Sequence, residues 1–247
     1  MPDARELQWH IHCQSGDVAR CVLLPGDRGR VARIVAQMDA ARLIAENREY
    51  LIYTGTTGGA PVSVCSTGMG GPAAAIALEE LANIGAEIFI RVGSCAGRQP
   101  DVAVGMPVIF TAAHRAEGTS RAYLPPEFPA VADLAVTNAL RDAARALGAD
   151  FRLGIATTRD AFYRVDLDEA EKFSQAGVIA AEMEAATLFI VGAFRRVRVG
   201  CLAVPDANRW LAVQPPPAER AQLFAAGEKQ MIAIALRAAQ LLAERGV

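Results

Sequence analysis

The segment Val178-Ile-Ala-Ala-Glu-Met-Glu-Ala-Ala-Thr-Leu-Phe-Ile190 is the one around which the rest of the chain is organised. It is typical of a short apolar strand that runs directly into an apolar helix. Two carboxylates, Glu182 and Glu184, lie at the junction, with only Met183 between them. A buried carboxylate is costly unless it is paired or hydrogen-bonded, and a pair of sugar hydroxyls would donate the bonds that it accepts. The alternative interpretation is an ordinary helix start with one acidic residue near the helix dipole.

Strands and helices alternate along the sequence on both sides of this segment. Compact apolar runs predict strands at residues 18–24, 43–45, 50–56, 61–66, 87–92, 106–113, 151–157 and 198–204. Amphipathic or apolar periodicity predicts helices at residues 31–38, 73–84, 131–147, 166–173 and 217–244. This alternation predicts an α/β fold: a single domain over residues 1–247, with a central mixed, largely parallel β-sheet flanked by helices.

The composition limits the possible functions. Apolar residues make up 52% of the chain and charged residues 21%, which is enough for a sizeable core, and the net charge of -2 argues against nucleic acid or an acidic membrane as a partner. The five cysteines form no CxxC pair and the three histidines are scattered, so we expect reduced thiols, no metal site and a cytoplasmic protein. The charged N-terminus lacks the apolar stretch of a signal peptide, and no apolar run reaches the ~20 residues of a membrane span.

Three loops that follow predicted strands carry groups suited to an anion. The first is Pro25-Gly26-Asp27-Arg28-Gly29-Arg30, the second is Thr67-Gly68-Met69-Gly70-Gly71-Pro72, and the third follows Arg91 as Gly93-Ser94-Cys95-Ala96-Gly97. Glycines allow backbone N–H groups to approach a phosphate, and a helix N-terminus favours negative charge. Because ligands bind outside the carboxyl ends of strands in open α/β sheets, we expect these loops to converge on one site. An ordinary turn with solvated arginines is the alternative for each loop taken alone.

Further polar and aromatic residues follow the later strands. Phe162 and Tyr163 can stack on a planar base or belong to the core or its rim, and Asp206 can serve a ligand or cap a turn. The polar, proline-containing stretch 115–129 is interpreted as a lid or a subunit contact.

Five motifs together resemble one family. They are Leu24-Pro-Gly-Asp27, Ser66-Thr-Gly-Met-Gly-Gly-Pro72, Arg91-Val-Gly-Ser94, Asp160-Ala-Phe-Tyr163 and Ala181-Glu-Met-Glu-Ala-Ala186. In this order they resemble the nucleoside phosphorylase-I family, and the chain is most similar to its uridine phosphorylase branch over about residues 10–242. The resemblance implies an enzyme, a pentosyltransferase that reversibly converts a nucleoside and inorganic phosphate into a free base and ribose 1-phosphate. It implies phosphate as a co-substrate and no cofactor.

The resemblance also implies roles for individual residues. It implies that phosphate is held by Gly26, Arg30, Arg91 and Ser94, with Arg48 reaching in from a neighbouring subunit. The ribose hydroxyls are expected on Glu184 and the backbone of Met183, with Glu182 either assisting or structural. His10 resembles the histidine that reaches the 5′-hydroxyl across a dimer interface, and His12 is the competing candidate. Shared sites imply a homo-oligomer, with the dimer as its smallest working unit and a hexamer, a trimer of dimers, as the family's usual form.

The base-binding end departs from the uridine phosphorylase pattern. The resemblance places Cys95, Gly97, Phe162, Tyr163 and Asp206 around the base. In uridine phosphorylases a Gln and an Arg after the Phe-Tyr motif grip uracil, and Asp166 and Asp168 stand here in their place. Asp206 aligns with the aspartate that purine-specific members use at N7 of the leaving base, although Pro205 before it is unusual for the family.

This departure sets the order of the predicted functions. Purine nucleosides such as inosine or guanosine are favoured, and the catalytic residues are Asp206, Glu184 and Arg91. The alternative is a uridine phosphorylase. Further alternatives are a nucleosidase, against which Arg30, Arg48 and Arg91 argue, and a catalytically silent nucleoside-binding or storage protein.

Overall fold

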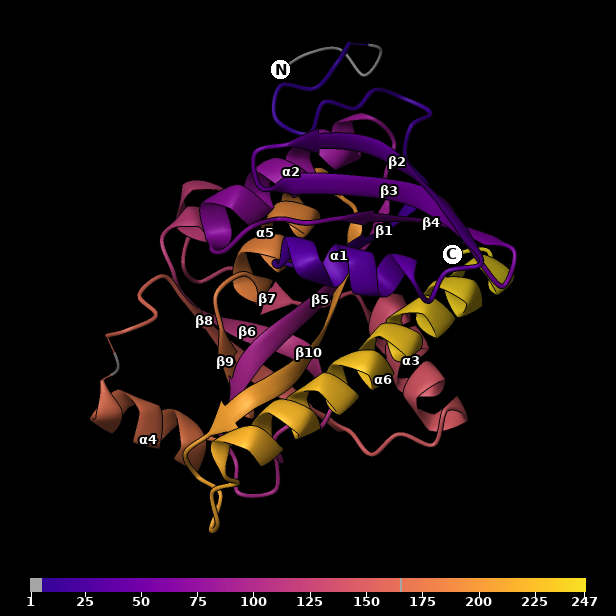
Figure 1. The fold of residues 1–247 in the computed structure, drawn as a ribbon. Coiled ribbons are helices and arrows are strands. Elements are labelled where there is room, and N and C mark those ends of the chain that lie inside the picture. Colours follow the sequence, from indigo (N-terminus) through magenta and orange to yellow (C-terminus); the bar gives the residue numbers. More distant parts are fainter. Residues whose placement is uncertain (1–5, 165) are drawn as a thin grey trace.

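A computed structural model describes residues 6–164 and 166–247, so the prediction about the extreme N-terminus falls mostly outside the described residues. Its centre is one mixed sheet with helices on both faces (Figure 1). The strands are β1 (Cys21–Leu24), β2 (Ala40–Asn47), β3 (Tyr50–Thr57), β4 (Ala60–Cys65), β5 (Ile88–Gly97), β6 (Val108–Ala116), β7 (Ala130–Val131), β8 (Arg152–Arg159), β9 (Ala180–Glu182) and β10 (Arg198–Asn208). The helices are α1 (Arg28–Val35), α2 (Gly71–Asn83), the short 3₁₀ helix η1 (Thr119–Ala122), α3 (Leu134–Ala146), α4 (Leu167–Gln175), α5 (Ala185–Arg195) and α6 (Pro217–Glu244).

The strand order shows a closed part and an open part. The path runs β10-β6-β8-β9-β5-β1-β4-β3-β2, and β10 also pairs with β5, so that five strands close into a ring. Strands β1, β4, β3 and β2 extend from this ring, and β7 pairs with β6. Parallel pairing joins β1 to β4 and β5, β5 to β10, and β8 to β6 and β9. The predicted α/β fold with a mixed sheet is confirmed. The sheet is not largely parallel as predicted: among the described residues, antiparallel strand pairs are as numerous as parallel ones.

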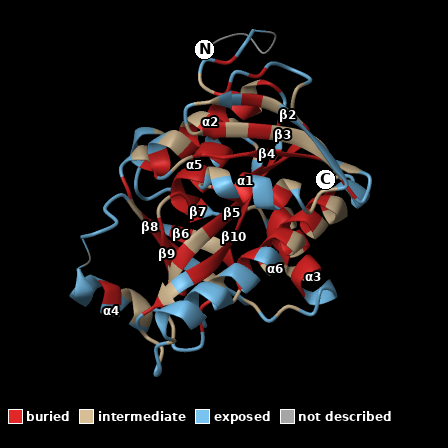
Figure 2. Ribbon diagram, viewed as in Figure 1, coloured by how far each residue is buried: buried red, intermediate tan, exposed pale blue. Residues whose placement is uncertain are grey.

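The helices bury two separate apolar cores against the sheet. Residues of α2 and α5 belong to one core, and residues of α1, α3 and α6 belong to the other. The strands β5 and β10 between them are almost wholly buried, and Figure 2 shows them in red behind the exposed outer side of α6. This burial on both faces explains the uninterrupted apolar runs that the sequence shows in these strands.

Two strands extend further than their apolar runs indicate. β5 continues through Gly93 to Gly97, a stretch predicted to be a loop, because its last residues pair with both β9 and β10. β10 likewise continues to Asn208, with a bulge between Pro205 and Ala207. Asp206 is the extra residue of this bulge. A bulge is a position where a strand accepts proline and where a side chain is re-aimed, so Pro205 fits the local backbone.

The stretch predicted to be a lid is tied to its own chain by Arg115. The guanidinium of Arg115 donates to the side chain and carbonyl oxygen of Ser120 and to the carbonyl oxygens of Leu124, Pro125 and Phe128, over 2.6–3.0 Å. Because the donors of one buried cation satisfy the carbonyls of the excursion, this segment is held in a fixed conformation.

Helix α4 lies apart from the body of the molecule. Ala170 is its one buried residue among those described, and Figure 1 shows the helix projecting at the lower left. The carboxylate of Asp166 caps its N-terminus by accepting from the N–H of Glu169 at 3.0 Å. The predicted helix is thus confirmed, and its cap accounts for Asp166.

Candidate active site

A cavity of about 960 Å³ opens at the carboxyl ends of β1, β5 and β10. It brings together most of the residues that the sequence predicted for the site. These are Gly26, Arg30, Arg91, Ser94, Cys95, Gly97, Phe162, Glu182, Met183, Glu184 and Asp206. No residue of the excursion 115–129 is among those that line it, so the interpretation of that segment as a lid over this cavity is not supported.

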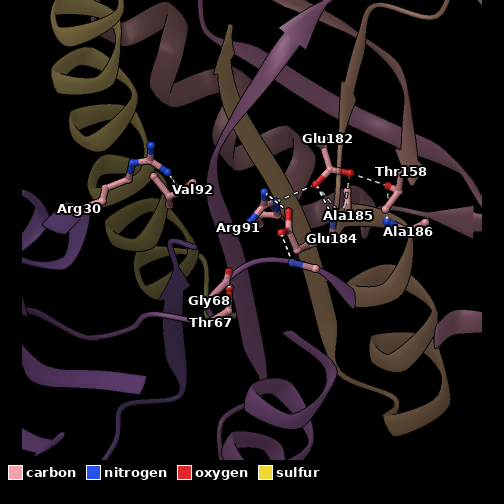
Figure 3. A network of polar contacts seen from close by, with 11 residues as sticks. Arg30, Thr67, Gly68, Arg91, Val92, Thr158, Glu182, Glu184, Ala185 and Ala186 are labelled. Atoms are coloured by element: carbon pink, nitrogen blue, oxygen red, sulfur yellow. Dashed lines mark hydrogen bonds and ion pairs between the residues drawn. The ribbon is translucent and has the colours of Figure 1, made fainter. Parts of the chain in front are cut away.

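Arg91 and the two carboxylates of the strand–helix junction form the centre of the site (Figure 3). Nε of Arg91 donates to Oε2 of Glu182 at 3.0 Å, and Nη2 donates to Oε2 of Glu184. Burial acts to lower the pKa of Arg91, but the charges of Glu184 and Glu182 outweigh it and raise the pKa, so that the guanidinium stays charged. Nη1 of Arg91 is buried and has no hydrogen-bond partner within the described structure. An unpaired donor of this kind is costly and is available to an anion.

Glu182 is fully engaged by the protein. Its carboxylate accepts from Oγ1 of Thr158 at 2.5 Å, from the N–H of Glu184 at 2.8 Å and from the N–H of Ala185 at 2.9 Å, in addition to Arg91. Burial raises its pKa, and the charge of Arg91 acts in the opposite direction. Of the two roles that the sequence left open, the geometry favours the structural one, in which Glu182 fixes the start of α5 and the direction of Arg91.

Glu184 retains capacity to bind a ligand. Oε1 accepts from the N–H of Gly70 at 2.6 Å and Oε2 accepts from Arg91, one protein donor for each oxygen. A carboxylate oxygen accepts two hydrogen bonds, so each oxygen can accept one more from a hydroxyl in the cavity. Met183, between the two carboxylates, also lines the cavity.

On the other side of Arg91, glycines allow a ligand to approach the backbone closely. Gly26 and Gly68 lie in contact, and a side chain at Gly26 would stand 3.0 Å from the carbonyl oxygen of Gly68. The N-terminus of α1 follows directly, capped by Asp27. Arg30, in the first turn of that helix, is buried, and its Nη1 donates to the carbonyl oxygen of Val92 at 3.1 Å. Glycine contacts, a helix N-terminus and two arginines together suit a phosphate.

A residue that the sequence did not single out, Glu228 of α6, balances this charge. Its Oε1 accepts from Nε of Arg30 at 2.6 Å, and its Oε2 pairs with Nε of Arg33 at 2.6 Å. Arg30 is unfavourable at a helix start, because the dipole there repels a cation, and Glu228 compensates for it. Glu228 lies 198 positions along the chain from Arg30, so only the folded structure reveals the pair.

At the far end of the cavity, Asp206 projects from the bulge of β10. Desolvation raises the pKa of its carboxyl, while the charges of Arg220 and Arg30 act to lower it. Burial also raises the pKa of the neighbouring Cys95 thiol, which therefore stays neutral. Phe162 lines this end and is 64% exposed, so its ring is accessible for stacking on a planar base.

Four residues at this end were not predicted as site residues. Arg98, Arg159, Arg209 and Trp210 all line the cavity. The sequence contained a partial indication of the three arginines, because each lies at the end of a strand. Arg98 and Arg209 directly follow β5 and β10, and Arg159 is the last residue of β8. Each was indistinguishable in the sequence from a solvated arginine at a strand end.

Three predicted site residues lie outside the cavity of this chain. Tyr163 is 95% exposed and packs edge-on against Phe162, with ring centroids 5.1 Å apart. Nδ1 of His10 is 2.6 Å from Oε1 of Glu80. Arg48 is exposed at the turn between β2 and β3, with a left-handed backbone (φ 52°). One chain alone therefore brings neither His10 nor Arg48 to the cavity that holds Arg91.

Neither a metal centre nor a membrane span is found in the part of the chain that the structure describes. Residues 6–164 and 166–247 contain no group of three or more His, Cys, Asp or Glu side chains placed to hold a metal ion. None of the helices within these ranges is long and apolar enough to cross a bilayer.

Comparison with known proteins agrees with this geometry. A family model described as the phosphorylase superfamily matches residues 20–240. The chain is 45% identical to the uridine phosphorylase of Thermococcus kodakarensis, over 96% of this chain and 87% of that protein, and 39% identical to the guanosine phosphorylase of Halorubrum lacusprofundi, over 81% and 83%. The crystal structure of uridine phosphorylase from Vibrio fischeri superposes with a TM-score of 0.87 at 30% identity, covering 95% of this chain and 97% of that one.

The fold and the site are thus those of an enzyme that cleaves nucleosides with phosphate as the nucleophile. The chain belongs to the nucleoside phosphorylase-I family within the phosphorylase superfamily. It is a pentosyltransferase that catalyses the phosphorolysis of nucleosides.

Proposed function

We propose that uridine is the preferred nucleoside, so that the enzyme converts uridine and phosphate into uracil and ribose 1-phosphate. The observation that supports it most strongly is the pair of Arg91 and Glu184: both residues line the cavity, Nη1 of Arg91 has no hydrogen-bond partner among the described residues, and each carboxylate oxygen of Glu184 accepts from one protein donor. The choice of base rests on the relatives, since several of them, including those from Thermococcus kodakarensis and Treponema pallidum, are named uridine phosphorylase. The preference for purines predicted from Asp206 is not supported by them.

The residues divide the reaction between them. Gly26, Arg30, Arg91 and Ser94 hold phosphate, and Glu184 with the backbone of Met183 holds the 2′- and 3′-hydroxyls of ribose. A phosphate oxygen forms a bond to C1′ as the C1′–N bond breaks, and the bonding electrons leave with the base, which then takes up a proton. Guanidinium groups and the carboxylate act most strongly in the transition state, where the sugar is cationic and the base anionic.

The phosphate end argues against hydrolysis. A nucleosidase would need only a water at this position, yet the cavity places Arg30 and Arg91 beside a glycine contact and a helix N-terminus. Carboxylates balance the charge of both arginines, but Nη1 of Arg91 keeps an unpaired donor, and this donor with the helix N-terminus suits an anionic nucleophile.

Purine nucleosides are the second candidate, on the strength of Asp206. The bulge of β10 aims this carboxyl at the cavity, and desolvation raises its pKa. A protonated carboxyl there can donate to N7 of a leaving purine.

The active enzyme is proposed to be a homo-oligomer with shared sites. His10 and Arg48 lie outside the cavity of their own chain, and the resemblance implies that they complete the site of a neighbour. A dimer is then the smallest working unit, and a trimer of dimers is the proposed assembly.

The test is the release of free base from uridine, inosine, guanosine and adenosine, each with and without phosphate. Phosphate-dependent cleavage led by uridine is expected. Cleavage led by inosine or guanosine would return the preference to purines, and cleavage at equal rates without phosphate would refute phosphorolysis.

A further inference from the structure

Three arginines gather at the end of the cavity opposite Arg30. Arg98 follows β5, Arg159 ends β8 and Arg209 follows β10, and all three line the cavity. Within residues 6–164 and 166–247, none of the three guanidiniums forms an ion pair or a hydrogen bond, although those of Arg98 and Arg209 contact the ring of Trp210. We name Arg98, Arg159 and Arg209 the arginine cluster. Its charge differs from that of Arg91 and Arg30, which Glu182, Glu184 and Glu228 balance.

Arg98 is the member held most firmly. It is only 5% exposed, and its Nε is buried without a hydrogen-bond partner. Its guanidinium carbon lies 4.9 Å from the ring centroid of Trp210, in the geometry of a cation–π contact. Desolvation lowers its pKa, the charges of Arg159 and Arg209 lower it further, and Glu169 acts in the opposite direction. The protein itself thus leaves a buried donor unsatisfied and three like charges close together, which a ligand with acceptor atoms would relieve.

The chemistry of guanidinium defines that ligand. Arginine has five N–H donors and no acceptor, so it pairs with carbonyl oxygens and unprotonated ring nitrogens but not with an amino group. A base whose edge carries oxo groups, such as uracil or hypoxanthine, offers acceptors to the cluster. The amino group of cytosine or adenine is a donor itself, so it would face the N–H donors of the arginines without forming a hydrogen bond. Asp206 also lines the cavity, but it lies on the bulge of β10 and, in the described part of the chain, forms no ion pair with a member of the arginine cluster.

The position of the cluster also resolves the departure noted in the sequence. Neither Asp166 nor Asp168 lines the cavity, and Asp166 is committed to capping α4. The cavity lining instead contains three guanidinium groups, which come from the ends of β5, β8 and β10.

We propose that Arg98, Arg159 and Arg209 form the base-recognition site and select nucleosides whose base presents oxo groups over those whose base presents amino groups. This inference rests on the proposed phosphorolysis but not on the choice between uridine and inosine. The cluster binds the carbonyl edge in the ground state, and it stabilises the negative charge that the base gains as the C1′–N bond breaks.

The test compares two matched substrate pairs, uridine with cytidine and inosine with adenosine, in the presence of saturating phosphate. In the wild-type enzyme the oxo member of each pair is expected to have the higher kcat/KM. The variants Arg98→Met and Arg159→Met keep the length of the side chain but remove its donors. Each should lower the ratio of oxo to amino kcat/KM by about 10- to 100-fold, because a hydrogen bond from a charged donor is lost. The KM for phosphate should stay within about twofold, since Arg30 and Arg91 are untouched.

Arg164→Met is the control. Arg164 lies in the same loop region, is exposed and does not line the cavity, so its removal should leave both ratios unchanged. If Arg98→Met fails to fold, Arg159→Met carries the test, because Arg159 is only half-buried. Calorimetric titration of each folded variant with uracil and with cytosine adds a readout independent of turnover.

The outcomes separate the two proposals. Unchanged ratios in both variants, or a rise in the KM for phosphate instead, would overturn the role of the arginine cluster. A wild-type enzyme that cleaves inosine but not uridine, with ratios that still collapse in the variants, would overturn the proposed uridine preference and uphold the cluster. Wild-type cleavage that ignores phosphate would refute the phosphorolysis while the titrations still test the cluster.

Discussion

Two carboxylates two positions apart have different tasks in this site. The four donors around Glu182 occupy its oxygens, whereas Glu184 keeps one free position on each oxygen. The sequence located both residues at a strand–helix junction but could not separate their roles, because spacing gives neither the position of Thr158 nor the direction of Arg91. The distinction follows from pairing across the sheet, where Thr158 lies opposite Glu182.

A substitution at Glu184 tests its proposed contact with the ribose. Glu184→Gln keeps the shape of the side chain and removes its charge and one acceptor. We expect kcat for uridine to fall about 10²-fold or more, because a carboxylate stabilises the cationic sugar of the transition state. The ratio of activity on uridine to that on 2′-deoxyuridine should also fall toward one, since the 2′-hydroxyl loses its acceptor. A variant that keeps the wild-type ratio would exclude the contact.

The pH dependence of purine cleavage tests Asp206. Desolvation raises the pKa of this carboxyl, so the protonated form that can donate to N7 persists to higher pH than for a free aspartate. The kcat/KM for inosine should therefore be highest below that pKa and should fall as the pH rises through it. Asp206→Asn should remove this limb of the profile. Uridine has no N7 and serves as the control; the same loss on both substrates would contradict the role.

At the scale of elements, long-range pairing decides what local pattern does not. The small residues 93–97 were predicted to be a loop, and they are strand because β9 and β10 both pair with them. Signals that are local predicted most elements, and α6 has the predicted bounds Pro217–Glu244. The helix predicted from residue 131 begins instead at Leu134, because Val131 belongs to the strand β7, which was not predicted. The arginine cluster was not predicted, because its members meet only where the ends of three strands converge.

Helix α6 contributes to the phosphate end through Glu228. Glu228→Gln should leave Arg30 buried and less firmly oriented, because the ion pair to its Nε is lost. We expect the KM for phosphate to rise about tenfold, with the KM for uridine unchanged. Initial rates over a grid of phosphate and uridine concentrations separate the two constants. Equal changes in both would mean that Glu228 acts only on overall stability.

At the scale of the whole molecule, the cavity of one chain lacks two of the groups proposed for it. Arg48 lies on the exposed turn between β2 and β3, where Nη1 of Arg28 donates to its carbonyl oxygen at 2.5 Å, and His10 is engaged by Glu80. The backbone of Arg48 and the ring of His10 are thus held by their own chain, and neither residue lines its cavity. We propose that they reach the phosphate and the ribose bound by a second copy of the chain.

Mixing two inactive variants tests this sharing. Arg48→Ala and Glu184→Ala, each alone, should reduce turnover about 10²-fold or more. In a heterodimer, the chain with Arg48→Ala keeps its own Glu184 and receives an intact Arg48 from its neighbour, so that one complete site forms while the other lacks both residues. Unfolding and refolding the two variants together should therefore recover about a quarter of wild-type turnover, since half the dimers are mixed and half of their sites are complete. Each variant refolded alone is the control. If Arg48 instead served the site of its own chain, every site in the mixture would lack one residue, and the mixture would be as inactive as its components.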